Sequence, residues 1–368
     1  MRSFDEIFED KTKYGTKIKT SEYKEIGKYA IIDQGQEEIA GYTDLEKGVF
    51  EDVPAIIFGD HTRVIKYVRD PFFLGADGVK ILKCKELNVN YKYLYYALKN
   101  AKIPNTGYNR HFKWLKQIQI EYPSIDKQEK IVKILDKVVM VIEDRRKEIQ
   151  ELDKLIKARF VEMFGDIKVN PNGYQLIKMR NLIASCEAGW SGNGIQRPKK
   201  ENEIAVLKVS SVTKGYFIPE ECKVLDNQDN IKKYISPKKG DLIFSRANTR
   251  EMVGATAITL EDYPKLILPD KLWRVRFGDK VNVFYMKYML SSKSIREQFS
   301  AVSTGTSGSM FNVSMEKFKS IEIPVAPINL QNQFADFVKQ VNKSKVAVQK
   351  ALDEAQLLFD SLMQEYFG

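Results

Sequence analysis

Two polar segments of the sequence follow short apolar runs, and their side chains can donate and accept hydrogen bonds. The candidate residues are Asp60, His61, Thr62, Arg63 and Lys66 in the first half, and Ser245, Arg246, Asn248, Thr249 and Arg250 in the second. Arginine can pair with guanine and asparagine with adenine in the major groove, while lysine neutralises phosphates. These residue types indicate recognition of nucleic acid, although each segment taken alone is compatible with an ordinary surface turn.

Each polar segment has a companion further along the chain. The first companion contains Asn105, Thr106, Tyr108, Asn109 and Arg110, and the second contains Thr304, Thr306, Ser307 and Ser309. Small residues with free backbone N–H groups let a chain approach phosphates closely. Because the pattern recurs in both halves of a chain with net charge +10, we expect a DNA-binding surface in each half.

The sequence contains no recognisable catalytic motif. It lacks the GxxxxGK[ST] phosphate-binding loop and the Asn-Pro-Pro-aromatic signature of amino-methyltransferases. Asp60 and His61 could form an acid–base pair, but neighbouring residues on a strand point to opposite faces. The two histidines and three scattered cysteines do not have the spacing of a metal site or a disulfide framework. We therefore expect a binding protein without a metal or cofactor of its own.

The composition is that of a soluble protein with about two domains. The chain has 368 residues, of which 43% are hydrophobic and 29% charged. It contains no run of 18 apolar residues, and the acidic segment 1–6 does not resemble a secretory signal. These features predict a cytoplasmic location. Lysine and arginine outnumber aspartate and glutamate by 59 to 49, which is equally compatible with a polyanionic partner and with a merely basic protein.

An internal repeat is the most informative feature of the chain. Residues 109–165 match residues 312–368 without a gap, at a constant offset of 203 residues (109 to 312). Gln128 falls on Gln331, and both copies end on the same Phe-Gly pair. The sequence therefore predicts the same structural unit twice.

Each copy ends in a predicted long helix with a narrow apolar seam, because most positions spaced alternately four and three apart are apolar. The first helix is about 50 Å long at roughly 1.5 Å per residue. A seam of this kind is not stable on an isolated helix, so each helix needs a partner. We expect the two helices to pack antiparallel as an intramolecular coiled coil with pseudo-twofold symmetry. A homodimer through the same seams is the alternative.

The segments outside the long helices consist of short apolar runs bounded by Gly, Pro, Asn and Asp, which predict mostly β structure. The expected fold class is α+β, with two mostly-β heads that share a plan but differ in sequence. The expected boundaries are a first head, a first spacer helix, a second head and a second spacer helix at 1–122, 123–165, 166–325 and 326–368.

This order of segments resembles the DNA-specificity subunit of type I restriction–modification systems. The run Ile57–Arg63 with the turn Gly75–Val79 resembles one class of its target-recognition domains. The runs Gly240–Arg246 and Gly305–Asn312 resemble another. The similarity extends over essentially the whole chain.

The resemblance implies a non-catalytic subunit whose two target-recognition domains each read half of a split double-stranded DNA sequence. The helices would determine the length of the DNA spacer that neither domain reads. They would also bind the modification (methyltransferase) subunits, which methylate adenine with S-adenosylmethionine. Cleavage would belong to an ATP-dependent restriction subunit. S-adenosylmethionine, ATP and Mg are accordingly expected only in the partner subunits.

Two other functions compete with this interpretation. One is a coiled-coil adaptor whose heads bind proteins, and the other is a single-chain DNA methyltransferase or nuclease. Salt-independent function without DNA affinity would favour the first, and turnover of DNA by the purified chain would favour the second.

Overall fold

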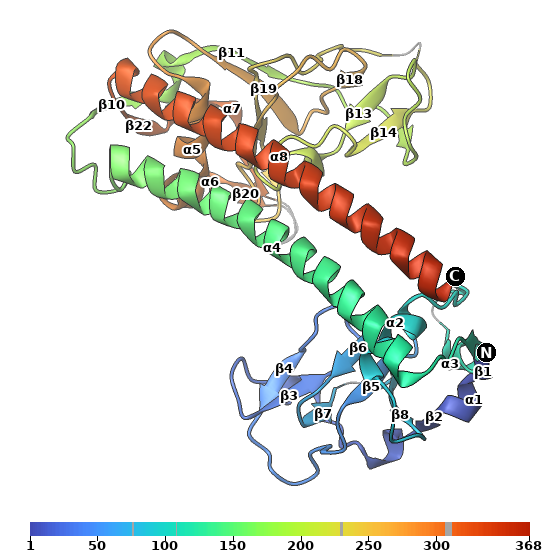
Figure 1. Ribbon diagram of the computed structural model, residues 1–368. Coiled ribbons are helices and arrows are strands. Elements are labelled where there is room, and N and C mark those ends of the chain that lie inside the picture. The colour runs from blue at the N-terminus through green and yellow to red at the C-terminus, as the bar shows by residue number, and fades with distance from the viewer. Residues whose placement is uncertain (76, 108, 229–230, 306–310) are drawn as a thin grey trace. The chain divides into compact units, whose positions relative to one another are not determined.

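The computed structural model describes residues 1–75, 77–107, 109–228, 231–305 and 311–368. The chain divides into two compact units. Unit 1 consists of Met1–Lys147 and Gln349–Gly368, and unit 2 consists of Glu148–Val348. Two long helices, α4 (Ile125–Phe164) and α8 (Ile328–Phe367), contribute one part to each unit (Figure 1).

Unit 1 contains a four-stranded sheet and a three-stranded sheet. The first has the order β2-β8-β5-β6, with bounds Phe8–Asp10, Val79–Cys84, Ala55–Gly59 and Ile65–Val68. The second has the order β4-β3-β7, with bounds Gly41–Thr43, Tyr29–Ile32 and Phe72–Leu74. A short pair joins β1 (Arg2–Ser3) to β9 (Gln119–Ile120). Strand β5 is buried along its whole length because it lies in the middle of its sheet.

Unit 2 contains two four-stranded sheets and two smaller ones. The order β11-β19-β15-β17 has bounds Ile183–Ala188, Leu272–Phe277, Leu242–Ser245 and Thr256–Ile258. The order β12-β14-β13-β18 has bounds Gly194–Ile195, Cys222–Leu225, Ala205–Leu207 and Leu266–Ile267. The smaller sheets are β16-β21-β20 (Ala247–Asn248, Phe311–Asn312, Thr304–Gly305) and β10-β22 (Gln175–Lys178, Glu322–Val325).

The two units share one strand topology. In unit 1, β5 lies between β8 and β6, and both pairings are antiparallel. In unit 2, β15 lies between β19 and β17 in the same way. In the second sheet of each unit one strand has an antiparallel and a parallel neighbour, β3 between β4 and β7, and β13 between β14 and β18. Strand β12 extends the sheet of unit 2 by an antiparallel pairing with β14. This agreement confirms the predicted α+β class with two heads of one plan.

Short helices connect and cover the sheets. Their bounds are α1 Phe4–Ile7, α2 Tyr91–Lys99, α3 Phe112–Leu115, α5 Val283–Ser291, α6 Lys293–Val302 and α7 Met315–Ser320. Four 3-10 helices within the described residues are η1 Thr12–Tyr14, η2 Thr20–Glu22, η3 Met179–Asn181 and η4 Val209–Ser211. No described helix is both long and apolar enough to cross a lipid bilayer.

The apolar seams of α4 and α8 bury each other within each unit. In unit 1, Leu135 of α4 belongs to the same apolar core as Phe359 and Met363 near the end of α8. In unit 2, Phe160 near the end of α4 belongs to the same core as Phe334 near the start of α8. The beginning of each helix therefore packs against the end of the other, which confirms the predicted antiparallel coiled coil within one chain.

A lysine of the α8 seam forms an ion pair with α4 in unit 2. Lys345 of α8 lies where the four-three spacing predicts an apolar residue, and its Nζ is 2.7 Å from the Asp153 carboxylate of α4. The lysine side chain is about one-fifth exposed. An ion pair in place of a hydrophobic contact fixes the register of the two helices at this point, as polar residues do in coiled coils.

Candidate nucleic-acid interface

In unit 1 the polar segment 60–63 forms the loop between β5 and β6. The Gly59 N–H donates to the Val64 carbonyl at 2.8 Å, and the Arg63 N–H donates to the Gly59 carbonyl at 2.7 Å. Arg63 adopts φ 61°, a left-handed conformation that is uncommon for a residue with a side chain. The tight loop therefore holds Arg63 in a strained backbone conformation. Such strain is concentrated at functional sites, which makes the Arg63 side chain a candidate for binding.

The companion segment is attached directly to this loop. The His111 N–H donates to the Asp60 carbonyl at 2.8 Å, and the His111 Nδ1 lies 3.0 Å from the same oxygen. The Asp60 carboxylate accepts from the Phe112 N–H at 2.7 Å, and an Nη of Arg63 donates to the Ile103 carbonyl at 3.3 Å. The residues that flank the companion segment therefore hold it beside the loop 60–63 in unit 1.

Burial separates the predicted residues of unit 1 into three groups. The exposed ones are Thr62, Asn105, Thr106, Asn109 and Arg110. His61 and Arg63 are partly buried. Asp60 and Lys66 are buried, and Lys66 donates to the Glu37 carbonyl and lies 3.4 Å from the Asp33 carboxylate. We therefore assign Asp60 and Lys66 a supporting role in the loops, in place of the DNA contact that the sequence suggested.

Gln34 is a supporting residue that the sequence did not reveal. Its backbone carbonyl accepts from the Thr62 hydroxyl at 2.6 Å. In its side chain, Oε1 accepts from the His61 N–H at 3.2 Å and Nε2 donates to the Asp77 carbonyl at 2.9 Å. One side chain thus links three loops that are distant in sequence. The hydrogen bond with Lys17 lowers the pKa of the neighbouring Asp77 carboxyl.

In unit 2 the polar segment 245–250 also meets its companion. The Val313 N–H donates to the Arg246 carbonyl at 2.8 Å, and β16 pairs with β21, which in turn pairs with β20. Ser245 is buried and its hydroxyl is directed at the Ala247 carbonyl at 3.4 Å. Thr304 takes part in this sheet through its backbone. The predicted contacts Tyr108, Thr306, Ser307 and Ser309 lie outside the described residues.

Arg246 is held along one edge of its guanidinium. Its Nε donates to the Asp270 carbonyl at 2.9 Å, and its Nη2 lies 3.2 Å from the Asp270 carboxylate, which also accepts from the Ser191 hydroxyl. Burial opposes ionisation of Asp270, but the Ser191 hydrogen bond and the Arg246 charge outweigh it and lower the pKa of the carboxyl. A guanidinium fixed in this way can present its other edge to a base with little loss of side-chain entropy.

The other predicted residues of unit 2 surround Arg246. Thr249 and Arg250 are exposed, and the Arg250 Nε donates to the Ser300 hydroxyl at 3.3 Å. Asn248 is partly buried and its Oδ1 accepts from the Thr249 N–H at 2.9 Å. This surface therefore combines an anchored arginine with exposed donors, as does the surface of unit 1.

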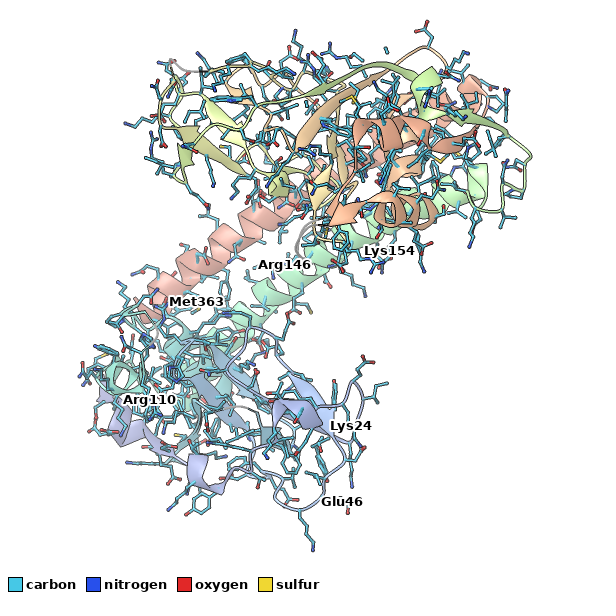
Figure 2. The ribbon with its side chains drawn as sticks, turned by 180° about the vertical axis from the view of Figure 1, so that it is seen from behind. Lys24, Glu46, Arg110, Arg146, Lys154 and Met363 are labelled. Carbon is cyan, nitrogen blue, oxygen red and sulfur yellow. The ribbon has the colours of Figure 1, made fainter. Side chains whose placement is uncertain are left out.

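Two exposed ion pairs of unit 1 lie away from Arg110. Lys24 pairs with Asp44 at 2.7 Å, and Lys28 pairs with Glu46 at 2.7 Å. Figure 2 shows Lys24 and Glu46 on one side of unit 1 and Arg110 on the opposite side. Paired lysines have already neutralised their charge, so the loops around Arg110 are the better polyanion surface.

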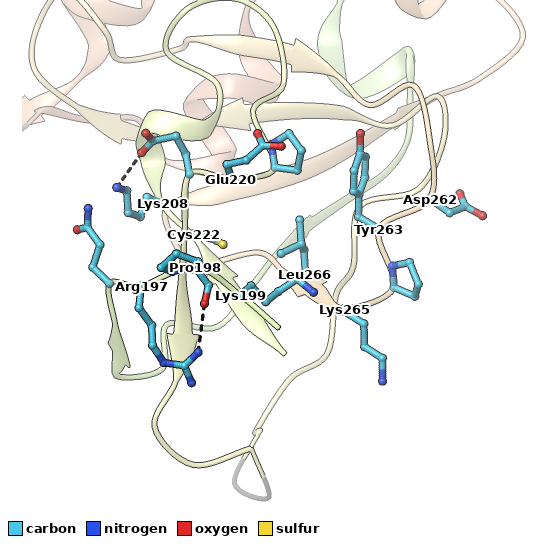
Figure 3. Close-up of a pocket in the computed structure, with 14 residues that line it drawn as sticks. Arg197, Pro198, Lys199, Lys208, Glu220, Cys222, Asp262, Tyr263, Lys265 and Leu266 are labelled. Carbon is cyan, nitrogen blue, oxygen red and sulfur yellow. Dashed lines mark hydrogen bonds and ion pairs between the residues drawn. The ribbon is translucent and has the colours of Figure 1, made fainter. Parts of the chain in front are cut away.

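A cavity of about 820 Å³ lies on the second sheet of unit 2 (Figure 3). Two of its cations are already paired, Arg197 with Glu203 and Lys208 with Glu221, both at 2.7 Å. None of its lining residues belongs to the predicted segments. Among the residues that the structure describes, no cluster of three His, Cys, Asp or Glu side chains has the arrangement of a metal site.

The fold and these surfaces define a class of protein with two heads of one topology, each carrying its own polar loops, and a shared helix pair. Residues 1–154 and 194–355 match the family of the type I restriction modification DNA specificity domain. The chain therefore belongs to this family, which confirms the resemblance read from the sequence.

Individual relatives agree with this assignment. The chain is 26% identical over 198 residues to the type I restriction enzyme EcoEI specificity subunit of Escherichia coli, covering 52% of this chain and 33% of the relative. It is 20% identical to the EcoKI specificity subunit of Escherichia coli strain K12, covering 67% and 55%. It is 22% identical to the EcoR124I/EcoR124II specificity subunit of Escherichia coli, covering 90% and 83%. The chain thus spans about a third and about half of the first two relatives.

Solved structures show the same fold. The S subunit of a type I restriction–modification system from M. genitalium matches with a TM-score of 0.57 and 16% identity, covering 100% of this chain and 95% of that one. A chain from a study of complex assembly and conformational transition in a type I restriction–modification system matches with a TM-score of 0.51 and 15% identity, covering 100% and 95%. At these identities the likeness concerns the fold and does not assign DNA contacts.

Proposed function

We propose that this chain is a DNA-specificity subunit that recognises a bipartite duplex sequence and has no catalytic activity of its own. The observation that carries the proposal is the recurrence of one arrangement in both units. In each, a polar loop follows the central strand of the first sheet, β5 or β15, and is hydrogen-bonded to a companion segment. The same topology with different loop residues suits two readers of two different half-sites.

The chemistry of modification and cleavage then belongs to partner subunits. Modification subunits would methylate adenine with S-adenosylmethionine, and a restriction subunit would cleave DNA with ATP and Mg. The chain itself would need no cofactor. The long helices α4 and α8 support a docking role for the modification subunits, since they leave large apolar side chains such as Met140, Val161 and Leu357 exposed to solvent.

The test is a DNA-binding assay with the purified chain, together with any modification subunits that co-purify. The target sequence is first identified by modified-base sequencing, and the affinity for duplexes that carry it is then measured. Affinity should fall steeply with salt, and a base-pair change in either half-site should cost about 1–3 kcal/mol. Changes in the spacer sequence should cost little. Turnover of DNA by the chain alone would support an enzyme, and salt-independent function without DNA affinity would support an adaptor.

The two arginines should act on separate half-sites. Arg246→Ala is expected to weaken or relax recognition at one half-site, and Arg63→Gly at the other, each by about 1–3 kcal/mol. Glycine is chosen at position 63 because it accepts the positive φ and so leaves the loop unstrained. Lys24→Ala, on the other side of unit 1, is the control and should leave both half-sites unchanged. If either arginine variant damages both half-sites equally, base reading by that residue is wrong.

A further inference from the structure

A buried glutamine joins the head of unit 1 to its long helix. Gln128 lies in the first turns of α4 and is 1% exposed. Its Oε1 accepts from the Asn90 N–H at 3.0 Å, and its Nε2 donates to the Pro123 carbonyl at 2.9 Å. Asn90 is the N-cap of α2, where its side chain accepts from two backbone N–H groups. One amide therefore connects the long helix, the turn that precedes it and a helix of the head.

Unit 2 repeats this joint. Gln331 of α8 is fully buried, and its Oε1 accepts from the Asn282 N–H at 2.8 Å. Its Nε2 donates to the Ala326 carbonyl at 2.7 Å and to the Lys280 carbonyl at 3.3 Å. Asn282 is the N-cap of α5, as Asn90 is of α2. In both units the glutamine Oε1 accepts from the N–H of a helix N-cap and its Nε2 donates to a carbonyl just before the long helix, and Gln331 has the additional bond to Lys280.

A tyrosine of each head strengthens the joint. The Tyr93 hydroxyl of α2 donates to the Glu121 carbonyl at 2.8 Å, and the Tyr285 hydroxyl of α5 donates to the Pro324 carbonyl at 2.8 Å. Both rings are fully buried. The short helix of each head is therefore bonded both to the long helix and to the segment that precedes it.

Stability alone does not explain why both joints are polar. A buried amide contributes little net stability compared with an apolar side chain of the same shape, because its hydrogen bonds replace those it made with water. Hydrogen bonds are directional, however, and a rotation of α2 against α4 would break the bond from the Asn90 N–H to the Gln128 Oε1. The recurrence of this glutamine connection in two heads of different sequence therefore indicates that it fixes the angle between the short helix and the long helix.

We infer that Gln128 and Gln331 are positioning residues that set the angle of each head on its long helix, and so determine which spacer length the chain accepts. This inference rests on the proposed function. Inserting one base pair rotates a half-site by about 34° around the duplex, since B-DNA has about 10.5 pairs per turn. A head held rigidly cannot follow that rotation, whereas a loosened head can.

The test compares Gln128→Met with the unaltered chain on duplexes whose spacer is of natural length or one pair longer. Methionine preserves the volume but removes both hydrogen bonds. We expect preference for the natural spacer to fall about tenfold, while base preference within each half-site is retained. Gln150→Met, an exposed glutamine of the same helix, is the matched control and should change neither property. Tyrosine fluorescence and thermal unfolding establish that each variant is folded.

If Gln128→Met does not fold, Tyr93→Phe provides the second variant, because it removes only the bond to the Glu121 carbonyl. A folded variant of either kind that keeps the full spacer preference overturns the inference. Loss of base preference at a half-site together with spacer preference also overturns it, because the residue would then support the reading surface itself. If the unaltered chain shows no preference for a bipartite site, the proposed function fails instead.

Discussion

Phe334→Ala is expected to lower the free energy of unfolding of unit 2 by about 3–5 kcal/mol, as large-to-small changes in packed cores do. The Phe334 ring is fully buried, and its centroid lies 5.3 Å from Phe160 and 5.6 Å from Phe164 of α4. It also lies 5.3 Å from Tyr288 of α5. The ring therefore connects both long helices and the head, and its loss leaves a cavity among side chains that cannot all move inward.

Tryptophan fluorescence isolates this effect. The chain has three tryptophans, of which Trp190 and Trp273 belong to unit 2 and Trp114 to unit 1. In a Trp114→Phe background, the urea midpoint of the remaining signal reports unit 2 alone. Val346→Ala on the same helix is the control, because Val346 is 71% exposed and should change the midpoint little. Equal midpoints for the two variants would contradict the assignment of Phe334 to the helix contact.

The pairing of the long helices could be predicted from the sequence because the periodicity of an apolar seam is a local property. Leu135 and Phe334 each belong to a series of mostly apolar residues spaced alternately four and three apart, and burying such a series requires only one partner helix. Strand order could not be predicted in the same way. The parallel pairing of β3 with β7 joins segments about forty residues apart, and nothing local in either run selects its neighbour.

The polar loops were also found from the sequence, but their inner organisation was not. Residue type predicts a DNA contact for Lys66, yet the fold turns it toward the Glu37 carbonyl and buries it. Gln34 and Asp270 are the opposite case, because the structure places them at the loops although the sequence did not suggest them. Neither lies near a motif, and both contact the loops through hydrogen bonds with residues distant in sequence. Long-range hydrogen bonds of this kind appear only when the sheets have been assembled.

Asp241→Ala should be the other strongly destabilising change, at about 3 kcal/mol. Asp241 is buried immediately before β15, and its carboxylate accepts from the Arg276 Nε at 2.6 Å and from the Lys238 N–H at 2.8 Å. Arg274 lies 3.9 Å away and also pairs with Glu187. Alanine leaves the Lys238 N–H without its acceptor and removes the buried charge that pairs with two arginines of β19.

The position of Asp241 gives this change a second, more specific consequence. Strand β15 leads directly from Asp241 to Ser245 and Arg246, so loosening its start should also disturb the loop that carries Arg246. Unfolding in the Trp114→Phe background measures the stability effect, and half-site binding measures the loop. Asp241→Asn keeps an acceptor for the Lys238 N–H and should lose about half as much stability, while exposed Glu261→Ala should lose almost none. A variant with a lower urea midpoint but unchanged binding to the Arg246 half-site would contradict this coupling. The ion pairs of Asp241 would then stabilise unit 2 without positioning the loop that carries Arg246.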